Sequence, residues 1–414
     1  MRSTGNPFLK VAQGIRWHVL GRFNTRIWTI TLIELVTAAG FSICIPFLAL
    51  YLYQERGLPM TLVGTAILIS GLSSAVTQIV SGFLSDRFGR RFLMLGAMGI
   101  SMLTYSGMVV LIWISAPVWA ILVVYVAGRS LGMAARPVIS AMIVDLSEKE
   151  RLTETYGLLR VGRNVGWAAG PAIGGYMATF LSYAWLFGVA VLTSTLAFCL
   201  ILFFLRESWK RTVESPNFRS MFSVVNNRIF VMFTALSLLV FLTMAQIGST
   251  LSVFTVDRLG FTTAEYGLLL TTNGLFVVLF QYPVARGIAR LAKSNTLILG
   301  SLFYGFGYLS LGWTASFTWA LVAMAVITTG EIIFSPVATS VVGELAPQDQ
   351  RGRYMGFFGW SETLGMSFAP LVGGVLLDVF PTNPGLVWGT IAILAFVAAI
   401  GFYWWGRVQR TTNI

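Results

Sequence analysis

The sequence predicts an all-α membrane protein in which twelve transmembrane helices form two pseudo-symmetric halves of six. The hydropathy of the chain, the length of its apolar runs and an internal repeat lead to this prediction. The 414 residues are 56% hydrophobic and only 11% charged, with a mean hydropathy of +0.78, whereas a soluble domain carries about 25% charged residues. Runs of about 20 apolar residues recur along the chain, and each can span the hydrocarbon core of a bilayer. They must be helices, because lipid offers no partner to unpaired backbone groups.

The apolar runs divide the chain into five parts. A cytoplasmic segment (1–26) precedes an N-terminal six-helix bundle (27–205), a charged linker (206–226), a C-terminal six-helix bundle (227–406) and a cytoplasmic tail (407–414). We expect the first segment not to be a removable signal peptide, since it lacks a small-residue cleavage site. It is either a helix on the inner membrane surface or a loose basic tail. The expected spans are 27–53, 60–84, 92–114, 118–146, 153–180, 183–205, 227–254, 262–285, 295–315, 317–344, 353–379 and 385–406.

The positive charges identify the side of the membrane on which each loop lies. With the N-terminus placed inside, the segments on that side hold 22 of the 28 Lys and Arg residues, and the loops on the other side hold only Arg56 and Arg258. This distribution follows the positive-inside rule and places both termini in the cytoplasm. The net charge of +12 therefore reflects topology in a bacterial-type inner (plasma) membrane, and not binding to nucleic acid.

An internal repeat relates the two halves. Several prolines and glycines recur after 199 positions without a gap, in the pairs Pro137/Pro336, Gly157/Gly356, Pro171/Pro370, Gly174/Gly373 and Gly175/Gly374. The acids Asp145 and Glu344 match at the same offset. Parallel repeats of this kind suggest a transporter whose site lies between the halves, near the membrane midplane.

A short charged turn, SGFLSDRFGRR (Ser81–Arg91), lies between the second and third spans. Gly82 lets another helix approach closely, and Gly89 permits the tight turn. Asp86 can accept hydrogen bonds from N–H groups at the start of a neighbouring helix and complement its dipole.

This turn resembles the inner-loop signature of the major facilitator superfamily: a glycine, an acid, an arginine, a second glycine and two basic residues. In that family the acid faces the start of helix 11, here near Arg353, and the basic residues can pair with Asp145 at the inner end of helix 4. The resemblance implies an inner gate that holds the halves together and opens when the transporter turns inward. Alternatively, the arginines only set the topology. The gate would comprise Gly82, Asp86, Arg87, Gly89, Arg90, Arg91 and Asp145.

The second half carries a weaker copy of the turn. At the offset of 199, only two arginines have basic counterparts, Arg286 and Arg290, while the acid and the second glycine fall on Ala285 and Ile288. We therefore expect an asymmetric inner gate that is held mainly through the first half.

Two further runs resemble motifs of the same family. Arg129–Gly132 resembles the arginine motif of helix 4, one residue shorter than many versions, which is linked with proton coupling. GWAAGPAIGG (166–175) resembles the helix 5 motif of proton antiporters, and a similar run at 365–374 must be structural. Glycines spaced by four allow close helix packing, and proline bends the helix. The motif implies antiport and export, and its residues are Gly166, Gly170, Pro171, Gly174 and Gly175.

Ionisable side chains at membrane depth are costly, so they mark functional sites. A cavity acid beside a mobile arginine can bind and release a proton as the conformation changes. We expect Glu34 with Arg129 to form the proton site of the first half, and Glu331 to be the next candidate, for protons or for a cationic substrate. The alternatives are a fixed ion pair for Glu34 and a hydrogen bond between helices for Glu331.

The substrate cavity is expected to be lined by Glu34, Arg136, Arg163 and Glu331. Arginine forms forked bonds to carboxylate or phosphate, so the arginines would favour an anionic or zwitterionic amphiphile. A pair between Arg163 and Glu362, its counterpart at the offset of 199, is a further alternative.

The sequence therefore predicts a secondary active transporter that works by alternating access. The resemblance implies proton-coupled export of small amphipathic compounds, a multidrug-type efflux. The alternative is transport of an anionic or zwitterionic solute or a lipid-like molecule in either direction. No enzyme is expected, because His18 is the only histidine and no HExxH, nucleotide loop or GxSxG elbow occurs in a suitable place. We expect no cofactor and no metal. The expected partners are a small-molecule substrate, protons and the lipid bilayer, and the expected state is a monomer.

Overall fold

The computed structural model describes residues 23–148, 151–208, 222–288, 290–347 and 350–412. The predicted fold class is confirmed, because these residues form helices joined by short loops. The N-terminal half consists of α2 (Thr25–Leu50) continued by η1 (Tyr51–Glu55), α3 (Met60–Phe88), α4 (Arg90–Trp113), α5 (Val118–Gly132) with α6 (Ala135–Leu146), α7 (Leu152–Phe180) and α8 (Tyr183–Phe204). The C-terminal half consists of η3 (Phe222–Asn226), α10 (Arg228–Met244) with η4 (Ala245–Ile247), α11 (Thr250–Val253) and η5 (Phe254–Arg258), then α12 (Thr263–Ile288), α13 (Lys293–Leu311), α14 (Phe317–Leu345), α15 (Arg351–Val379) and α16 (Pro384–Thr412). Most of the predicted N-terminal segment, residues 209–221 of the linker and the last two residues of the tail lie outside the described residues.

The twelve predicted spans correspond to twelve long helical segments of the described chain, and ten of these are long and apolar enough to cross a membrane. The two others are α7 and α13. Helix α7 carries Arg160 and Arg163 among its glycines, and α13 begins at Lys293 and is rich in glycine and tyrosine. These polar and small residues lower the mean hydropathy of both helices.

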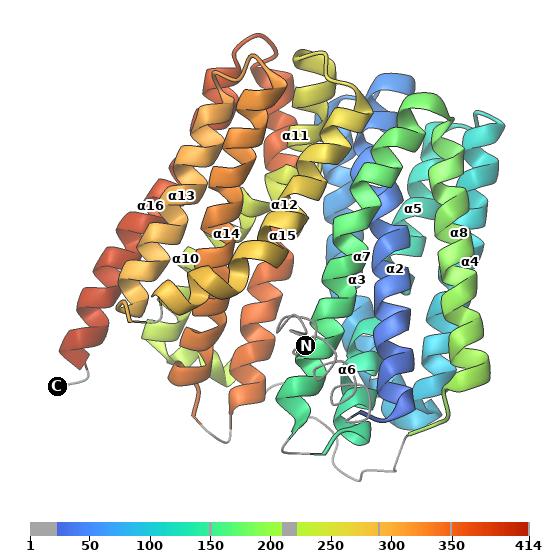
Figure 1. The fold of residues 1–414 in the computed structure, drawn as a ribbon, viewed down its shortest axis with the longest axis horizontal. Helices are drawn as coiled ribbons and strands as arrows, with labels where there is room; N and C mark the ends of the chain where they lie inside the picture. Colours follow the sequence, from blue (N-terminus) through green and yellow to red (C-terminus); the bar gives the residue numbers. More distant parts are fainter. Residues whose placement is uncertain (1–22, 149–150, 209–221, 289, 348–349, 413–414) are drawn as a thin grey trace, which may run out of the picture.

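The two halves lie side by side (Figure 1). Within the N-terminal half, α2 packs along α7 and α4 packs along α8, while α13 packs against α14 and α16 in the other half. The halves meet through two helix pairs, α3 with α15 and α7 with α12. We call the end with the turn at Gly89 the basic end, and the end with the turns at Gly57 and Gly260 the opposite end.

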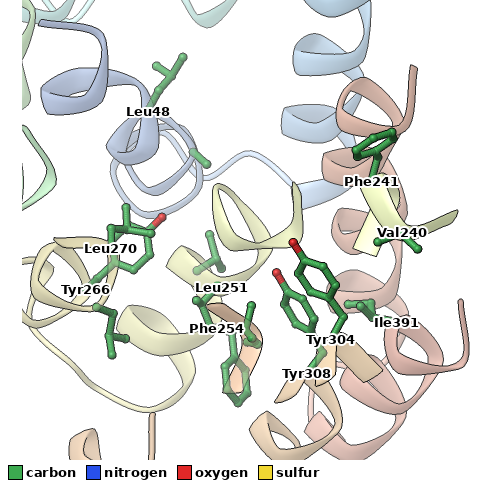
Figure 2. Packing of buried hydrophobic residues seen from close by; sticks show 14 of the residues in the cluster. Leu48, Val240, Phe241, Leu251, Phe254, Tyr266, Leu270, Tyr304, Tyr308 and Ile391 are labelled. Atoms are coloured by element: carbon green, nitrogen blue, oxygen red, sulfur yellow. The ribbon is translucent and has the colours of Figure 1, made fainter. Parts of the chain in front are cut away.

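An aromatic core stabilises the C-terminal half. Tyr304 and Tyr308 lie next to each other in α13 (Figure 2), and Trp388 of α16 stacks on Tyr308 with ring centroids 5.7 Å apart. The core continues into the other half at the opposite end, where Phe47 of α2 meets Tyr266 of α12 edge to face. Burial of such large rings supplies much of the packing energy.

The backbone shows the internal repeat more completely than the sequence does. The turn glycines Gly57 and Gly260 both have positive φ, 65° and 72°, and lie 203 positions apart. The π-helical turns η1 and η5 are separated by the same number. The offset changes to 199 at α5 and α14 because α13 has 19 residues where α4 has 24, and the following loop is one residue longer. The offset of 199 is therefore wrong for the first three helices of each half.

Several contacts between the halves close the opposite end, and the repeat relates two of them to each other. Asp378, near the end of α15, accepts hydrogen bonds from the N–H groups of Met60 and Thr61 at the start of α3, at 3.1 and 2.7 Å, and from the Thr61 hydroxyl at 2.6 Å. Its counterpart, Thr179 of α7, accepts a hydrogen bond from the N–H of Ala264 at the start of α12, at 3.1 Å. Both contacts satisfy free donors at a helix start, but only the first involves a charged group.

The halves part towards the basic end. A Cβ added at Gly82 of α3, Gly287 of α12, Gly157 of α7 or Gly356 of α15 would meet no atom within 4 Å. In contrast, a Cβ on Gly374 or Gly175 would overlap backbone atoms of the other half. The ribbons of the two halves diverge at the end that carries the Gly89 turn (Figure 1). The structure is thus open at the basic end and closed at the opposite end.

The cap at Asp378 yields a testable prediction. Asp378→Asn removes a charged acceptor and should weaken closure by about 1–2 kcal/mol, or about 5- to 30-fold in the population open at the opposite end. A cysteine placed at Met366, in a chain whose Cys44 and Cys199 are replaced, should react correspondingly faster with an impermeant maleimide added outside intact cells. Thr179→Val, which removes the neutral counterpart, should have a smaller effect. Equal labelling of Asp378→Asn and the parent would show that this cap does not hold the opposite end closed.

Candidate functional site: a cavity between the halves

A cavity lies between the halves. It receives side chains from α2, α3, α5, α6 and α7 on one wall and from η4, α12 and α15 on the other. The volume of the cavity is about 240 Å³, just below the range of about 300–1000 Å³ that is usual for small-molecule pockets. The wall is mainly apolar, with a few hydroxyl and amide groups and two charged side chains, Arg129 and Arg136.

A buried ion pair lies beside this cavity. The Glu34 carboxylate of α2 accepts a hydrogen bond from Nε of Arg163 in α7 at 2.7 Å; 8% of the Glu34 side chain and 37% of the Arg163 side chain is exposed. Arg163 lies one helical turn from Trp167, which lines the cavity. The ion pair that the sequence left open for Glu34 is present, and its cation is Arg163, not Arg129. The alternative pair of Arg163 with Glu362 is absent from the described structure.

Glycines of the predicted helix 5 motif bring α7 onto α2 and so allow this pair. A Cβ added at Gly166 would overlap the Leu35 carbonyl oxygen, and one at Gly174 would overlap that of Ile43. Gly170 meets the hydroxyl of Ser42 in the same way. The close approach places the side chain of Arg163, three positions before Gly166, against α2.

The other face of the motif contacts the second half. Gly175 packs on the start of α12, and the carbonyl oxygen of Pro171 would overlap a Cβ added at Gly267. The motif therefore contributes both to packing within the first half and to closure at the opposite end. The predicted bend at Pro171, which lies inside α7, stays a prediction.

Arg129 and Arg136 lie on the cavity wall without an ion pair. The Arg129 guanidinium lies over the ring of Phe41, 4.4 Å from its centroid, in a cation–π contact. Among the described residues, no carboxylate oxygen lies within 4.0 Å of a nitrogen of either arginine. The expected pairing of Glu34 with Arg129 is therefore wrong in this conformation, because Arg163 occupies the carboxylate and Phe41 holds Arg129.

Glu331 lies away from the cavity wall, inside the second half. Its carboxylate accepts a hydrogen bond from the side-chain amide of Asn273 in α12 at 3.0 Å, and the same amide donates to Thr328. This is the hydrogen bond between helices that the sequence left open. The hydroxyl of Tyr304, which packs against Gly330, is buried without a hydrogen-bond partner in the described structure.

The charged turn is a contact within one half. Gly89 has a φ of 94°, as the tight turn requires, and Arg90 forms an ion pair with Asp145 of α6. Arg91 does not pair with Asp145; its guanidinium donates to the carbonyl oxygen of Leu202 at 2.7 Å. The expected role in holding the halves together is absent from this conformation, because all these partners belong to the N-terminal half.

Among the described side chains of the expected inner gate, Gly82 and Arg87 form no hydrogen bond or ion pair with the second half. Nothing approaches Gly82, because the halves part at this end. Arg87 is exposed, with its guanidinium 5.4 Å from the ring centroid of Phe88. The side chain of Asp86 lies outside the described structure, so its capping role stays a prediction.

The sequence missed two participants in these contacts. The Glu207 carboxylate, just after α8, accepts hydrogen bonds from the N–H groups of Arg90 and Arg91 at 3.0 Å each and so caps α4. In the second half, Lys293 pairs with Glu344. Lys293 is the counterpart of Arg90 at the corrected offset of 203, so the turn is less degenerate than expected. An acid directly after the sixth span and a base at the start of α13 were the available signals.

No metal centre occurs in the described part of the chain, since no three His, Cys, Asp or Glu side chains cluster there. The two helical halves, the cavity between them and the buried charges beside it together define a membrane transporter. The chain belongs to the Major Facilitator Superfamily, whose sequence model matches residues 30–264 and 233–413.

Similar proteins include bacterial transporters with varied substrates. The uncharacterized MFS-type transporter YqjV of Bacillus subtilis is 26% identical over 362 residues, covering 85% of this chain and 86% of that protein. The Na⁺, Li⁺, K⁺/H⁺ antiporter of Planococcus maritimus is 25% identical, covering 90% and 93%, and the quinolone resistance protein NorA of Staphylococcus aureus is 24% identical, covering 83% and 88%.

Solved structures share the fold. A peptide transporter POT in complex with sulfate aligns with a TM-score of 0.74 and 17% identity, over 91% of this chain and 93% of that chain. A D-xylose–proton symporter aligns with a TM-score of 0.74 and 15% identity, over 91% and 96%. At these identities the likeness concerns the fold alone.

The pairing of Glu34 with Arg163 can be tested by a double-mutant cycle. Glu34→Gln and Arg163→Gln should each destabilise the protein by about 2–3 kcal/mol, below the range for fully buried pairs because Arg163 is partly exposed. The double variant should lose much less stability than the sum of the two single losses, because neither charge is then left without its partner. Thermal unfolding in detergent, followed by tryptophan fluorescence, measures these changes. The control cycle uses Glu34→Gln with Arg129→Gln, which should be additive; coupling in that cycle and additivity in the first would contradict the observed pairing.

Proposed function

We propose that the protein is a proton-coupled exporter of small amphipathic compounds, acting as a monomer in a bacterial plasma membrane. The observation that carries this proposal is the buried Glu34–Arg163 pair beside a mainly apolar cavity that opens at the basic end. The positive-inside rule assigns the basic end to the cytoplasm. An amphipathic compound could then reach the cavity from the cytoplasm or the inner leaflet.

Protonation of Glu34 links proton binding to the relative position of the two halves. A proton on the carboxylate neutralises it and releases the Arg163 guanidinium. Glu362 lies on α15 of the other half, one helical turn from Met366, which lines the cavity. A released Arg163 would attract Glu362 and favour closure at the basic end. Only such a difference in interaction between states can couple proton binding to a conformational change.

Exchange also requires that proton and substrate compete. A cationic group on the substrate is repelled by the charge that protonation of Glu34 leaves on Arg163, so one carrier would bind either the proton or the cation.

Glu331 is the second candidate for the proton, because its carboxylate is held between α12 and α14 by Asn273. The names of two relatives, an antiporter that uses H⁺ and a quinolone resistance protein, support exchange and efflux.

A second candidate function follows from the two unpaired arginines of the cavity wall. Arg129 and Arg136 would favour an anionic solute, and protonation of Glu34 would add the charge of Arg163 to theirs. Proton and anion would then bind together, and their movement would be symport. The sign of proton movement therefore separates the two functions.

Proteoliposomes with a pH-sensitive dye inside test the proposal. A substrate added outside should make the lumen more alkaline if the protein exchanges it for protons, and Glu34→Gln should slow this change at least about tenfold, as is typical of removing a positioned proton carrier. Glu148→Gln, at a surface ion pair with Arg151, is the matched control and should behave as the parent. Acidification of the lumen would support the anion symporter. Substrate flux without proton movement, equal in Glu34→Gln, would contradict both.

A further inference from the structure

The first wall of the cavity presents positive charge that no described acid neutralises by an ion pair. Arg136 of α6 is exposed and lines the cavity, and Arg129 of α5 lines it too, with its guanidinium over the ring of Phe41. The Glu34 carboxylate cannot serve them in this conformation, since Arg163 takes it at 2.7 Å. An arginine facing an apolar cavity is a ready site for a carboxylate, phosphate or sulfonate group, which it binds through two parallel hydrogen bonds.

One negative charge, Glu362 of α15, lies beside the second wall. Thr363 and Met366 of α15 line the cavity, and Glu362 lies one helical turn from Met366 on the same side of α15. No Lys or Arg nitrogen of the described residues lies within 4.0 Å of its carboxylate.

The space between these charges is apolar. Pro46 and Leu48 of α2, Leu270 of α12 and Met366 line it, together with the large ring of Trp167. A ligand that fills it must therefore carry an apolar body, and its charges must lie at its ends. Cavities of this kind take their specificity from a few placed polar groups.

We propose that the substrate is a zwitterionic amphiphile, with an acidic group bound by Arg136, an ammonium group bound by Glu362, and an apolar body between them. The proposal rests on the proposed function, whose substrate class it narrows. Arg129 supports the acidic group as a second positive charge. A single anion would leave Glu362 unpaired in the loaded cavity, and a single cation would leave both arginines unpaired, so only a ligand with both charges offers an opposite charge to each side.

The same arrangement suits exchange against protons. Protonation of Glu34 frees the Arg163 guanidinium to pair with Glu362, and the ammonium group of the ligand pairs with the same carboxylate, so proton and ligand exclude each other. The acidic group of the ligand binds Arg136 and thereby fixes the orientation of the ligand in the cavity. A zwitterion therefore resolves the conflict between a positive cavity wall and an exchange mechanism.

Calorimetric titration of the purified full-length protein with three matched probes tests the proposal. The probes are 6-(aminomethyl)-2-naphthoate, its methyl ester, and 6-methyl-2-naphthoate, which carry both charges, only the cation, and only the anion. The zwitterion should bind at least about tenfold more tightly than either of the others, as one charged hydrogen-bonded contact is worth. Equal or tighter binding of the ester or of 6-methyl-2-naphthoate would overturn the proposal, as would failure of all three to bind at millimolar concentration.

Two variants should have crossed effects. Arg136→Gln should weaken the zwitterion and 6-methyl-2-naphthoate by about tenfold and leave the ester unchanged; Glu362→Gln should weaken the zwitterion and the ester by the same factor and leave 6-methyl-2-naphthoate unchanged. Arg286→Gln, near the basic end of α12 and outside the cavity wall, should leave all three affinities unchanged. Equal effects of a variant on all three probes would contradict the assignment. If a variant does not fold, Arg136→Lys and Glu362→Asp replace it, because they keep the charge and should lose affinity in the same crossed pattern.

These titrations are made at equilibrium without a gradient, so they are independent of transport direction. Tight binding of the zwitterion with no proton movement in proteoliposomes would contradict proton-coupled export and leave the substrate class standing. Proton-coupled transport of the methyl ester, without preference for the zwitterion, would support proton-coupled export and contradict the proposed substrate class.

Discussion

The close packing of α7 on α2 is the constraint on which the rest of this structure depends. Lipid cannot satisfy a buried charge, so a carboxylate at the position of Glu34 needs a partner from a neighbouring helix. Gly166, Gly170 and Gly174 let the backbones approach until side-chain atoms of α2 touch the main chain of α7. Arg163 then reaches Glu34, and Trp167, one turn further, reaches the cavity. Packing and charge placement are therefore one property of this helix pair.

The pseudo-symmetry explains how the halves can close at one end and part at the other. At the opposite end, a residue near the end of a long helix in one half caps the start of a helix in the other half. Asp378 of α15 caps α3, and Thr179 of α7 caps α12. At the basic end, each half has an internal ion pair, Arg90 with Asp145 and Lys293 with Glu344. These ion pairs join helices within each half and do not cross between the halves. Opening the opposite end would break the two caps and the neighbouring contacts, such as that of Tyr53 with Asp257.

The fold could be predicted almost wholly from the sequence, because the length and hydropathy of a membrane helix follow directly from bilayer thickness. Gly89 and the Arg90–Asp145 pair could also be predicted, since both lie within a local turn and its neighbouring helix. The partner of Glu34 could not, because the choice between Arg129 and Arg163 depends on which helix packs on α2 and on how Phe41 is turned. The predicted offset of the repeat was wrong for the helices before α5 and α14, because α13 is shorter than α4. This difference in length does not change the motifs from which the offset was read.

The central claim is that release of Arg163 from Glu34 draws the halves together at the basic end. Pulsed electron paramagnetic resonance tests it most directly, with spin labels at Gly157→Cys and Gly356→Cys, two exposed positions with no neighbour within 4 Å of an added Cβ, in a chain whose Cys44 and Cys199 are replaced. Glu34→Gln imitates the protonated carboxylate. The account predicts that this substitution raises the population of the shorter distance between the labels, and that adding Glu362→Gln cancels the increase. An unchanged distribution, or a shift to longer distances, would contradict it.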